Sequence, residues 1–432
     1  MKKISLFLVA FSLSLAVCAQ SAREEIRRNH CLSASNHVAY PGPVQQRLTP
    51  APSGYEPFYL SHYGRHGSRY LIRGSEYLRP IRLFEHADSA GVLTAMGRDV
   101  LRRIRMMYEE SKDRWGELTP LGARQHREIA RRMYERFPQV FADTVGVDAK
   151  STVVIRCILS MENALQELVR LNPRLRITHD ASEHDMYYMN QTDTALSHNK
   201  ETPAVKAAYD KWTKEHVNFD HLMKTLFTQR SFVADSKMMT ESDFVFRLFR
   251  LAGILQDSEL RHKITLYDIF TDDELYTGWQ QNNIWWYLHY GNTALNGGTQ
   301  PFSQRNLLRN IIHEADSCLR LRHPGATLRF GHETMVLPLT CLLDINGYGE
   351  QIADIDRLEE HGWVNYRIFP MAANLQLVFY RNNKKPGDVL VKVLLNENEV
   401  RLPLPSDLAP YYRWSDFRRL RKRQGMSVAQ RT

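Results

Sequence analysis

Three side chains that suit phosphate chemistry stand together in the segment Arg65-His66-Gly67-Ser68-Arg69-Tyr70. An arginine guanidinium keeps its charge and can bind two phosphate oxygens at once. A neutral imidazole is a competent nucleophile near neutral pH, and Gly67 lets the backbone approach a ligand closely. A histidine between two arginines is therefore suited to capture a phosphoryl group. The same spacing fits a solvated basic loop equally well.

Two later segments place similar side chains behind other predicted strands. Arg156 directly follows a β-branched run at 152–155, and His332-Glu333 follows a predicted strand at 327–330. In α/β sheets, ligands bind outside the carboxyl ends of the strands. Such side chains follow three predicted strands, and three occurrences are harder to attribute to chance than one. The three segments are therefore predicted to meet in one site.

In these motifs the sequence resembles the histidine phosphatase superfamily, in its acid phosphatase and phytase branch. That branch has an R-H-G-x-R-x-P motif early and an H-D or H-A-E motif late. The first segment is most similar to the R-H-G-T-R-Y-P form of multiple inositol polyphosphate phosphatases. Gly116-Glu117-Leu118-Thr119 with Gly122, and Arg156 with the four residues after it, are similar to other segments of the family. The resemblance extends over nearly the whole chain after residue 19.

The resemblance implies a role for each matching residue. His66 would attack phosphorus and become phosphohistidine, while Arg65, Arg69, Arg156 and His332 would bind the phosphate oxygens. A carboxylic acid would protonate the leaving alkoxide and later activate water. No metal and no cofactor is implied.

Two positions depart from the family pattern. Leu71 stands where the family has proline, which loosens the loop but removes no chemical group. If the late motif is aligned on Pro338, the H-A-E form would place glutamate at Thr334, whereas Glu333 takes the aspartate position of H-D with one extra methylene. Glu333 is therefore our candidate proton donor. Its alternative interpretation is an acid that the dipole favours at a helix N-terminus.

Arg73 and Arg79, which follow the first motif, are candidates for binding further phosphates of a substrate. Equally, they fit exposed charges beside a helix, which is the usual place for arginine.

Strands alternate with helices at both ends of the chain, which predicts an α/β fold. We expect a large α/β domain, with a central sheet flanked by helices, from residues 20–184 and 301–432. Residues 185–300 are rich in aromatic and helix-forming residues and predict a smaller, mostly α-helical inserted domain. The expected strands lie at 58–60, 152–155, 175–178, 327–330, 375–380, 388–395 and 400–402. The expected helices lie at 95–110, from Pro120 with Thr119 as cap, at 161–171, from Ser303 and at 334–343.

Residues 1–19 are typical of a signal peptide: Lys2 and Lys3 precede an apolar stretch, with small residues before a cut at Gln20. We expect an exported protein that stays in the periplasm, associates with the outer membrane or is secreted. Lipidation of Cys18 is disfavoured because Val17 is bulky. Cleavage would leave four cysteines, which fit buried small hydrophobes at least as well as disulfides, and their pairing is open. These are Cys31, Cys157, Cys318 and Cys341.

The formal charge is +9, but the last twenty residues carry seven basic residues and one acid. The chain therefore has a basic tail, which is a candidate for contacting anionic surfaces, rather than a basic body. No later run approaches the ~20 apolar residues that a membrane span needs. Nucleic acid is an improbable partner for an exported chain without a reading motif.

The preferred function is a metal-independent phosphomonoesterase that removes phosphates from inositol polyphosphates such as phytate. A broad histidine acid phosphatase and a catalytically weak polyanion-binding relic are the alternatives, and a metal hydrolase is a further rival.

Overall fold

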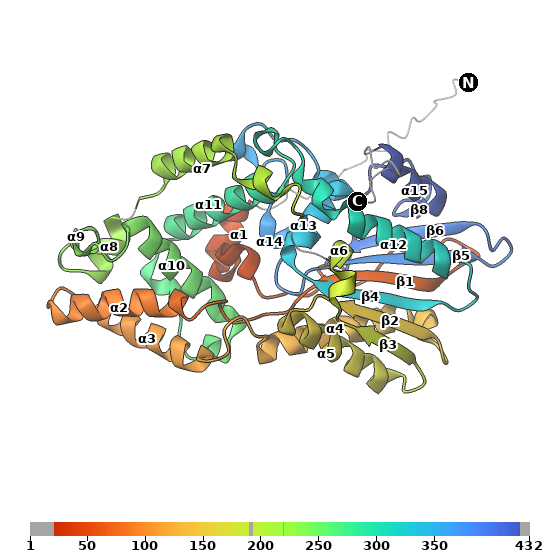
Figure 1. Cartoon of the computed structure of the whole chain (residues 1–432), viewed down its shortest axis with the longest axis horizontal. Helices are drawn as coiled ribbons and strands as arrows, with labels where there is room; N and C mark the ends of the chain where they lie inside the picture. Colours follow the sequence, from red (N-terminus) through yellow and green to blue (C-terminus); the bar gives the residue numbers. More distant parts are fainter. Residues whose placement is uncertain (1–20, 190–192, 219, 424–432) are drawn as a thin grey trace, which may run out of the picture.

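A twisted sheet forms the centre of the computed structural model, which describes residues 21–189, 193–218 and 220–423. The strands are ordered β3-β2-β4-β1-β5-β6-β7, and β8 pairs with β6 (Figure 1). The first four strands in this order are parallel, and the other pairings are antiparallel. The predicted α/β fold class is confirmed. The strands are β1 Tyr55–Arg65, β2 Gly146–Ser151, β3 Arg176–Asp180, β4 Gly325–Gly331, β5 Asn374–Asn382, β6 Val389–Leu395, β7 Asn398–Glu399 and β8 Tyr411–Arg413.

Helices cover both faces of this sheet (Figure 1). One face packs on α4 and α5, whose apolar stripes include Ile129 and Leu165. The other face packs on α12 and α13, with Leu308 and Leu337 in the shared core. The helices are α1 Ala22–Arg28, α2 Ser75–Ser89, α3 Ala95–Ser111, α4 Pro120–Arg136, α5 Ile155–Leu171, α6 Met186–Met189, α7 Pro203–His216, α8 Asp220–Leu226, α9 Phe232–Ser236, α10 Glu241–Ile254, α11 Asp272–Tyr290, α12 Arg305–Cys318, α13 Glu333–Leu342, α14 Asn365–Ile368 and α15 Trp414–Arg423.

A second, helical region lies beside the sheet, at the left of Figure 1. Its core joins α2 and α3 to α8 and α10, through residues such as Phe84, Leu226 and Phe244. The described residues of 185–300 are helical or irregular, as their composition predicts, apart from an isolated β-bridge between Phe227 and Leu93. The domain boundaries themselves stay a prediction.

The register of the parallel strands brings their carboxyl ends to one edge. Arg65 pairs with Gly331 across β1 and β4, and Ser151 pairs with Phe330 across β2 and β4. The segments that follow β1, β2 and β4 must therefore leave the sheet side by side. This edge is where the sequence places its phosphate chemistry.

Two strand predictions are wrong. The run 152–155 follows β2 rather than forming a strand, since pairing ends at Ser151 and α5 begins at Ile155. Arg156 thus lies in the first turn of a helix. Likewise, 400–402 is not a strand: the tight turn at Asn396 and Glu397, both with positive φ, leads into β7, which pairs with β6 and ends at Glu399.

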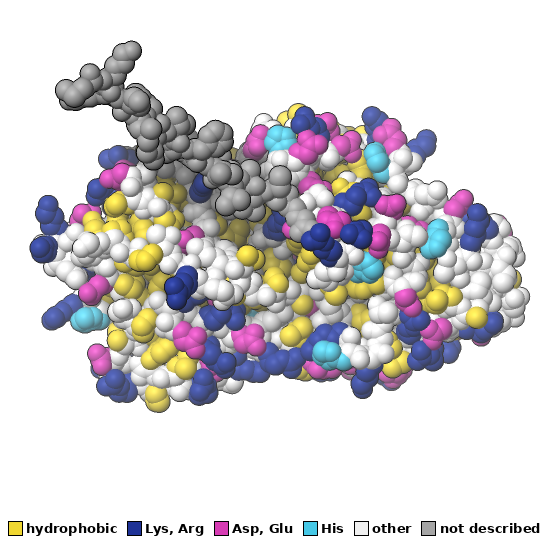
Figure 2. Space-filling view, turned by 180° about the vertical axis from the view of Figure 1, so that it is seen from behind, with side chains coloured by type: hydrophobic (Ala, Val, Ile, Leu, Met, Phe, Trp, Pro, Cys, Tyr) yellow, Lys and Arg dark blue, Asp and Glu magenta, His cyan; other side chains and the backbone are white. Residues whose placement is uncertain are grey.

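No disulfide joins the four cysteines of the described residues, which are Cys31, Cys157, Cys318 and Cys341. Within the described ranges, no helix has the length and apolar character needed to cross a membrane. Figure 2 views the molecule from the side opposite to Figure 1 and shows Lys and Arg interspersed with Asp and Glu over its surface. The predicted signal peptide and the end of the basic tail lie outside the described residues.

Candidate active site

β1 delivers Arg65 and His66 to the carboxyl edge of the sheet. The backbone N–H of Arg65 donates to Ala373 O at 2.7 Å, and that of His66 donates to Gly331 O at 2.8 Å. Both side chains are almost fully buried, at 0% and 1% exposed. The strand ladder thus continues to the histidine and fixes the direction in which its side chain leaves the sheet.

The loop after His66 is held against the start of α4. Thr119 caps this helix, and its N–H and hydroxyl group both donate to Ser68 O, at 2.9 and 3.1 Å. A Cβ added to Gly67 would stand 2.6 Å from Gly122 O. Glycine is therefore required here because the loop and the helix backbone touch.

The hydrogen bonds of His66 set its tautomer. Nδ1 lies 2.9 Å from Gly67 O, and a carbonyl oxygen only accepts, so Nδ1 carries the hydrogen. Nε2 then keeps its lone pair and faces Glu333 Oε2 at 3.6 Å. Burial, with help from Arg156 and Arg65, holds the pKa of His66 well below its usual value. The imidazole is therefore neutral and nucleophilic in acid as well as at neutral pH.

Glu333, the first residue of α13, faces Arg65 across the site. Its Oε2 lies 3.0 Å from Arg65 Nε, and Asn36 Nδ2 donates to its Oε1 at 3.3 Å. Burial alone would raise the pKa of Glu333, but the charges of Arg65 and Arg69 outweigh it and hold the pKa well below its usual value. Glu333 is thus an ionised carboxylate, and the same oxygen, Oε2, lies close to both the Arg65 guanidinium group and His66 Nε2.

His332 ends the β4 segment next to His66. The two ring centroids are 5.7 Å apart. His332 Nε2 lies 3.2 Å from Thr152 Oγ1, and Cys157 Sγ lies 3.6 Å from the same nitrogen. Burial, then the charge of Arg156, lowers the pKa of His332 to about 3, so this ring is neutral too.

Arg69 and Arg156 complete the positive side of the site. Arg69 is 3% exposed, whereas Arg156 is half-buried at the rim. Burial, followed by the charge of Arg69, lowers the pKa of Arg156, which indicates that the two guanidinium groups lie close. Nη2 of Arg65 and the Nε atoms of Arg69 and Arg156 are buried without a hydrogen-bond partner among the described residues. Buried donors are rarely left unbonded, so these groups form a ready site for an oxyanion.

The five predicted phosphate-site residues, with Glu333, therefore meet at one edge of the sheet; their roles stay predictions. His66, His332 and Glu333 offer three metal-ligating atoms within 4.8 Å of one another. Three arginine charges beside them oppose a cation and favour an anion.

Arg73 lies apart from this cluster, in a neighbouring cavity of about 380 Å³. Arg79, Arg247 and Arg250 line the same cavity, so α2 and α10 both contribute to it. Two acids partly balance these charges, since Glu76 lies 2.6 Å from Arg250 and Asp243 lies 3.2 Å from Arg79. The excess charge suits further anionic groups of a ligand.

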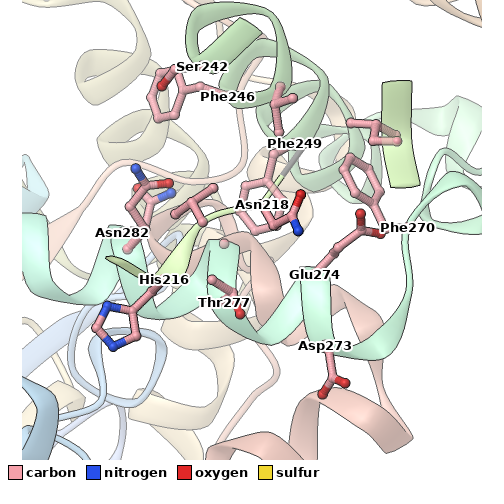
Figure 3. A pocket seen from close by; sticks show the side chains of 15 residues that line it. His216, Asn218, Ser242, Phe246, Phe249, Phe270, Asp273, Glu274, Thr277 and Asn282 are labelled. Atoms are coloured by element: carbon pink, nitrogen blue, oxygen red, sulfur yellow. The ribbon is translucent and has the colours of Figure 1, made fainter. Parts of the chain in front are cut away.

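Another cavity, of about 230 Å³, lies between α10 and α11 (Figure 3). Phe246, Phe249 and Phe270 form its apolar wall, and it shares no lining residue with the cluster around His66. It is built by packing among the helices, and Phe246 lines both this cavity and the one around Arg73.

Four site residues were not found from the sequence. Asn36 contacts both Arg65 and Glu333, and His37 is buried close to the same two charges. Thr152 contacts His332. Asp257 accepts a hydrogen bond from Ser68. None belongs to a recognisable motif. Only their tertiary contacts with the motif residues identify them.

Comparisons with known proteins show what this chain is similar to. The model of the histidine phosphatase superfamily (branch 2) matches residues 65–396. Multiple inositol polyphosphate phosphatase 1 of Gallus gallus is 23% identical over 402 residues, which cover 84% of this chain and 82% of that protein. The resemblance inferred from the motifs is confirmed.

Solved structures show the same fold. The multiple inositol polyphosphate phosphatase of Bifidobacterium longum, in complex with inositol hexasulfate, has a TM-score of 0.78 at 19% identity, covering 89% of this chain and 96% of that one. The phytase of D. castellii has a TM-score of 0.59 at 14% identity, covering 91% and 84%.

Proposed function

This chain belongs to the histidine phosphatase superfamily (branch 2), and from that premise we propose that it removes phosphates from inositol polyphosphates such as phytate. One observation carries the proposal. Arg65, Arg69 and Arg156 each hold a buried N–H group without a hydrogen-bond partner among the described residues, and they belong to the same cluster as His66, whose Nε2 is unprotonated. A phosphate monoester seated there would have its oxygens bound and its phosphorus beside the nucleophile.

The reaction we propose has two halves. In the first, His66 Nε2 attacks phosphorus, an N–P bond forms, and the bond from phosphorus to the inositol oxygen breaks. That oxygen takes a proton from Glu333. In the second half, water attacks the phosphohistidine, Glu333 takes the proton of the water, and phosphate leaves. The arginines stabilise the charge that spreads over the phosphoryl oxygens in each transition state.

Glu333 must gain a proton before it can give one. An entering phosphate group takes hydrogen bonds from Arg65 and places negative charge beside the carboxylate. Both changes raise the pKa of Glu333, because the charge of Arg65 is the main cause of its low value. We propose that substrate binding thereby converts the carboxylate into the acid that the reaction needs.

The arginine cavity supports a polyphosphorylated substrate. Arg73, Arg79, Arg247 and Arg250 lie next to the catalytic loop, where they would bind phosphates that are not being cleaved. The relatives named above act on, or were solved with, ligands of this class. A broad acid phosphatase would gain little from such a cavity.

We also propose that the protein is exported, on the basis of its first nineteen residues. Expression of the full chain in a bacterium, followed by sequencing of the N-terminus of the periplasmic protein, tests this. A mature protein that begins at Gln20 supports it, and retention of residues 1–19 contradicts it.

The test of function compares wild type with His66→Ala on phytate and on an aryl phosphate. We expect His66→Ala to abolish turnover of both, and acid quenching during turnover to trap covalent phosphate on wild type alone. His313→Ala, on the exposed face of α12, is the matched control and keeps full activity. Turnover by His66→Ala would refute the nucleophile. A preference for the aryl phosphate would indicate the broad phosphatase, and phosphate binding without turnover would indicate the relic.

A further inference from the structure

A buried acid from the helical region reaches the catalytic loop. Asp257 is the last residue of η5 (Leu255–Asp257), directly after α10, and it is 0% exposed. Its Oδ1 accepts a hydrogen bond of 2.5 Å from Ser68 Oγ. Ser68 stands between the catalytic histidine and Arg69, so this contact joins the helical region to the centre of the loop.

The hydrogen bonds around Ser68 run in one direction. Its backbone N–H donates to Gln125 Oε1 at 2.9 Å, which fixes the orientation of the Gln125 amide. Gln125 Nε2 then donates to Ser68 Oγ at 2.9 Å. The Ser68 hydroxyl hydrogen is left for Asp257, which must accept. Every polar atom of Ser68 is thereby fixed, and Asp257 is the acceptor at the end of the chain.

Asp257 also lies in the field of the phosphate-binding arginines. Arg65 and Arg69 face it from the loop, and Arg261 faces it from η6 (Glu259–His262). Cys31 and Tyr267 are the titratable groups near it from η1 (His30–His37) and η7 (Tyr267–Ile269).

The second carboxyl oxygen of Asp257, Oδ2, is buried without a hydrogen-bond partner among the described residues. Burial raises the pKa of Asp257 to about 8, against the opposing effects of Ser68 and the arginines. The group therefore changes charge within the range of ordinary assays.

We propose that Asp257 is a positioning residue of the phosphate site: through Ser68 it holds the loop that carries Arg69, and its charge tunes the anion affinity of Arg65 and Arg69. The inference rests on the proposed phosphate chemistry of this site. The helical region would then contribute to the phosphate site in two ways: through the contact of Asp257 with the catalytic loop, and through the arginines of α10.

Substitutions test the positioning role. Asp257→Ala is expected to lower kcat/KM for an aryl phosphate by about 10- to 100-fold, because small displacements of binding groups cost this much. Ser68→Ala with Asp257→Ala should lower it no further, since both act through one hydrogen bond. Asp257→Asn keeps an acceptor oxygen and should restore kcat/KM to within about 3-fold. The control Glu167→Gln alters another buried acid, on α5, and should keep kcat/KM.

Sulfate binding, followed by calorimetry, tests the charge. Above its pKa the Asp257 carboxylate is negative and opposes an anion, so wild type should bind sulfate about 3- to 10-fold more weakly at about pH 9.5 than at about pH 7. Asp257→Asn should show no such loss. An equal loss in both proteins, full kcat/KM in Asp257→Ala, or additive effects in the double variant would each overturn the proposal.

These readouts separate this inference from the proposed function. Sulfate is neither hydrolysed nor titrated over this range, so its binding reports on Asp257 even if phytate is not a substrate. If Asp257→Ala does not fold, Asp257→Asn and the sulfate measurement decide. Failure of the wild type to hydrolyse any phosphomonoester would contradict the proposed function but not the effect of Asp257 on anion binding.

Discussion

Glu333 is the residue whose chemistry changes most between the resting site and the proposed reaction. In the resting site it is a buried carboxylate against Arg65 and Asn36, 3.6 Å from the nucleophilic nitrogen of His66. It thus sits where a phosphate oxygen would compete for the same guanidinium group. Its dual position, as a partner of Arg65 and as an acid beside the leaving group, can be tested through the leaving group itself.

Glu333→Gln should affect poor leaving groups most. An alkoxide of inositol needs a proton, whereas a nitrophenolate leaves without one, so kcat/KM, which reports the first half of the reaction, should fall by about 100- to 10,000-fold on an inositol phosphate and far less on nitrophenyl phosphate. Initial rates on both substrates measure this. Equal losses on the two would show that another group donates the proton.

The low pKa of His66 has a consequence for pH dependence. The nucleophile must be unprotonated, and burial together with two arginines keeps it so well below the usual histidine pKa of about 6.5. The kcat/KM for nitrophenyl phosphate should therefore not fall as the pH drops through about 6. A profile with an acid limb at about 6.5 would contradict the buried, neutral imidazole.

At the scale of elements, the start of α4 determines how the catalytic loop is held. Thr119 caps the helix and donates to Ser68, while Gln125, nearly two turns later, binds the same residue. Gly67 and Gly122 permit the close contact between the two backbones. The loop thus takes its shape from a helix that begins more than fifty residues later, rather than from its own sequence.

Gly122→Ala should therefore damage the site. The added Cβ meets the Ser68 backbone, so the loop and α4 must separate, and we expect a loss of about 1–3 kcal/mol in stability with at least a 10-fold loss in kcat/KM. Thermal unfolding and steady-state kinetics measure the two effects. Gly387→Ala, with no atom within 4 Å of the added Cβ, is the control and should match wild type.

At the scale of the whole molecule, buried ion pairs join distant parts of the chain. Glu397, in the turn between β6 and β7, is 1% exposed. It accepts from Arg132 of α4 at 2.9 and 2.7 Å and from Tyr40 of the N-terminal segment at 2.8 Å. Three regions of the sequence therefore depend on one carboxylate.

Glu397→Ala should lower the free energy of unfolding by about 3–5 kcal/mol, because it leaves the arginine without its buried partner. Denaturant unfolding of the purified protein measures this. Glu128→Ala removes an exposed acid 4.0 Å from the same arginine and should cost no more than about 1 kcal/mol. A similar small loss in both would show that Glu397 does not join these regions.

The family and the class of fold could be predicted from the sequence, and the structure and comparisons confirm both. The Arg65–Tyr70 motif and His332-Glu333 are short segments whose residue types predict an oxyanion site, and alternating strands and helices predict the sheet that brings them to one edge. Such signals are local, so they survive without knowledge of packing. The β-branched run before Arg156 predicts a strand, but pairing ends at Ser151, and Val153 and Ile155 are exposed where the chain turns into α5.

The partners of the motif residues, and the pKa values of the buried groups, could be found only from the tertiary structure. Asn36 meets Glu333 across 297 residues, and Asp257 meets Ser68 across 189. Contacts of such separation depend on how whole elements pack. The pKa of a buried carboxyl likewise depends on solvent exclusion and on neighbouring charges. Both carboxyl groups are buried, but the charge of Arg65 outweighs burial at Glu333 and holds its pKa low, whereas burial prevails at Asp257 and raises its pKa to about 8.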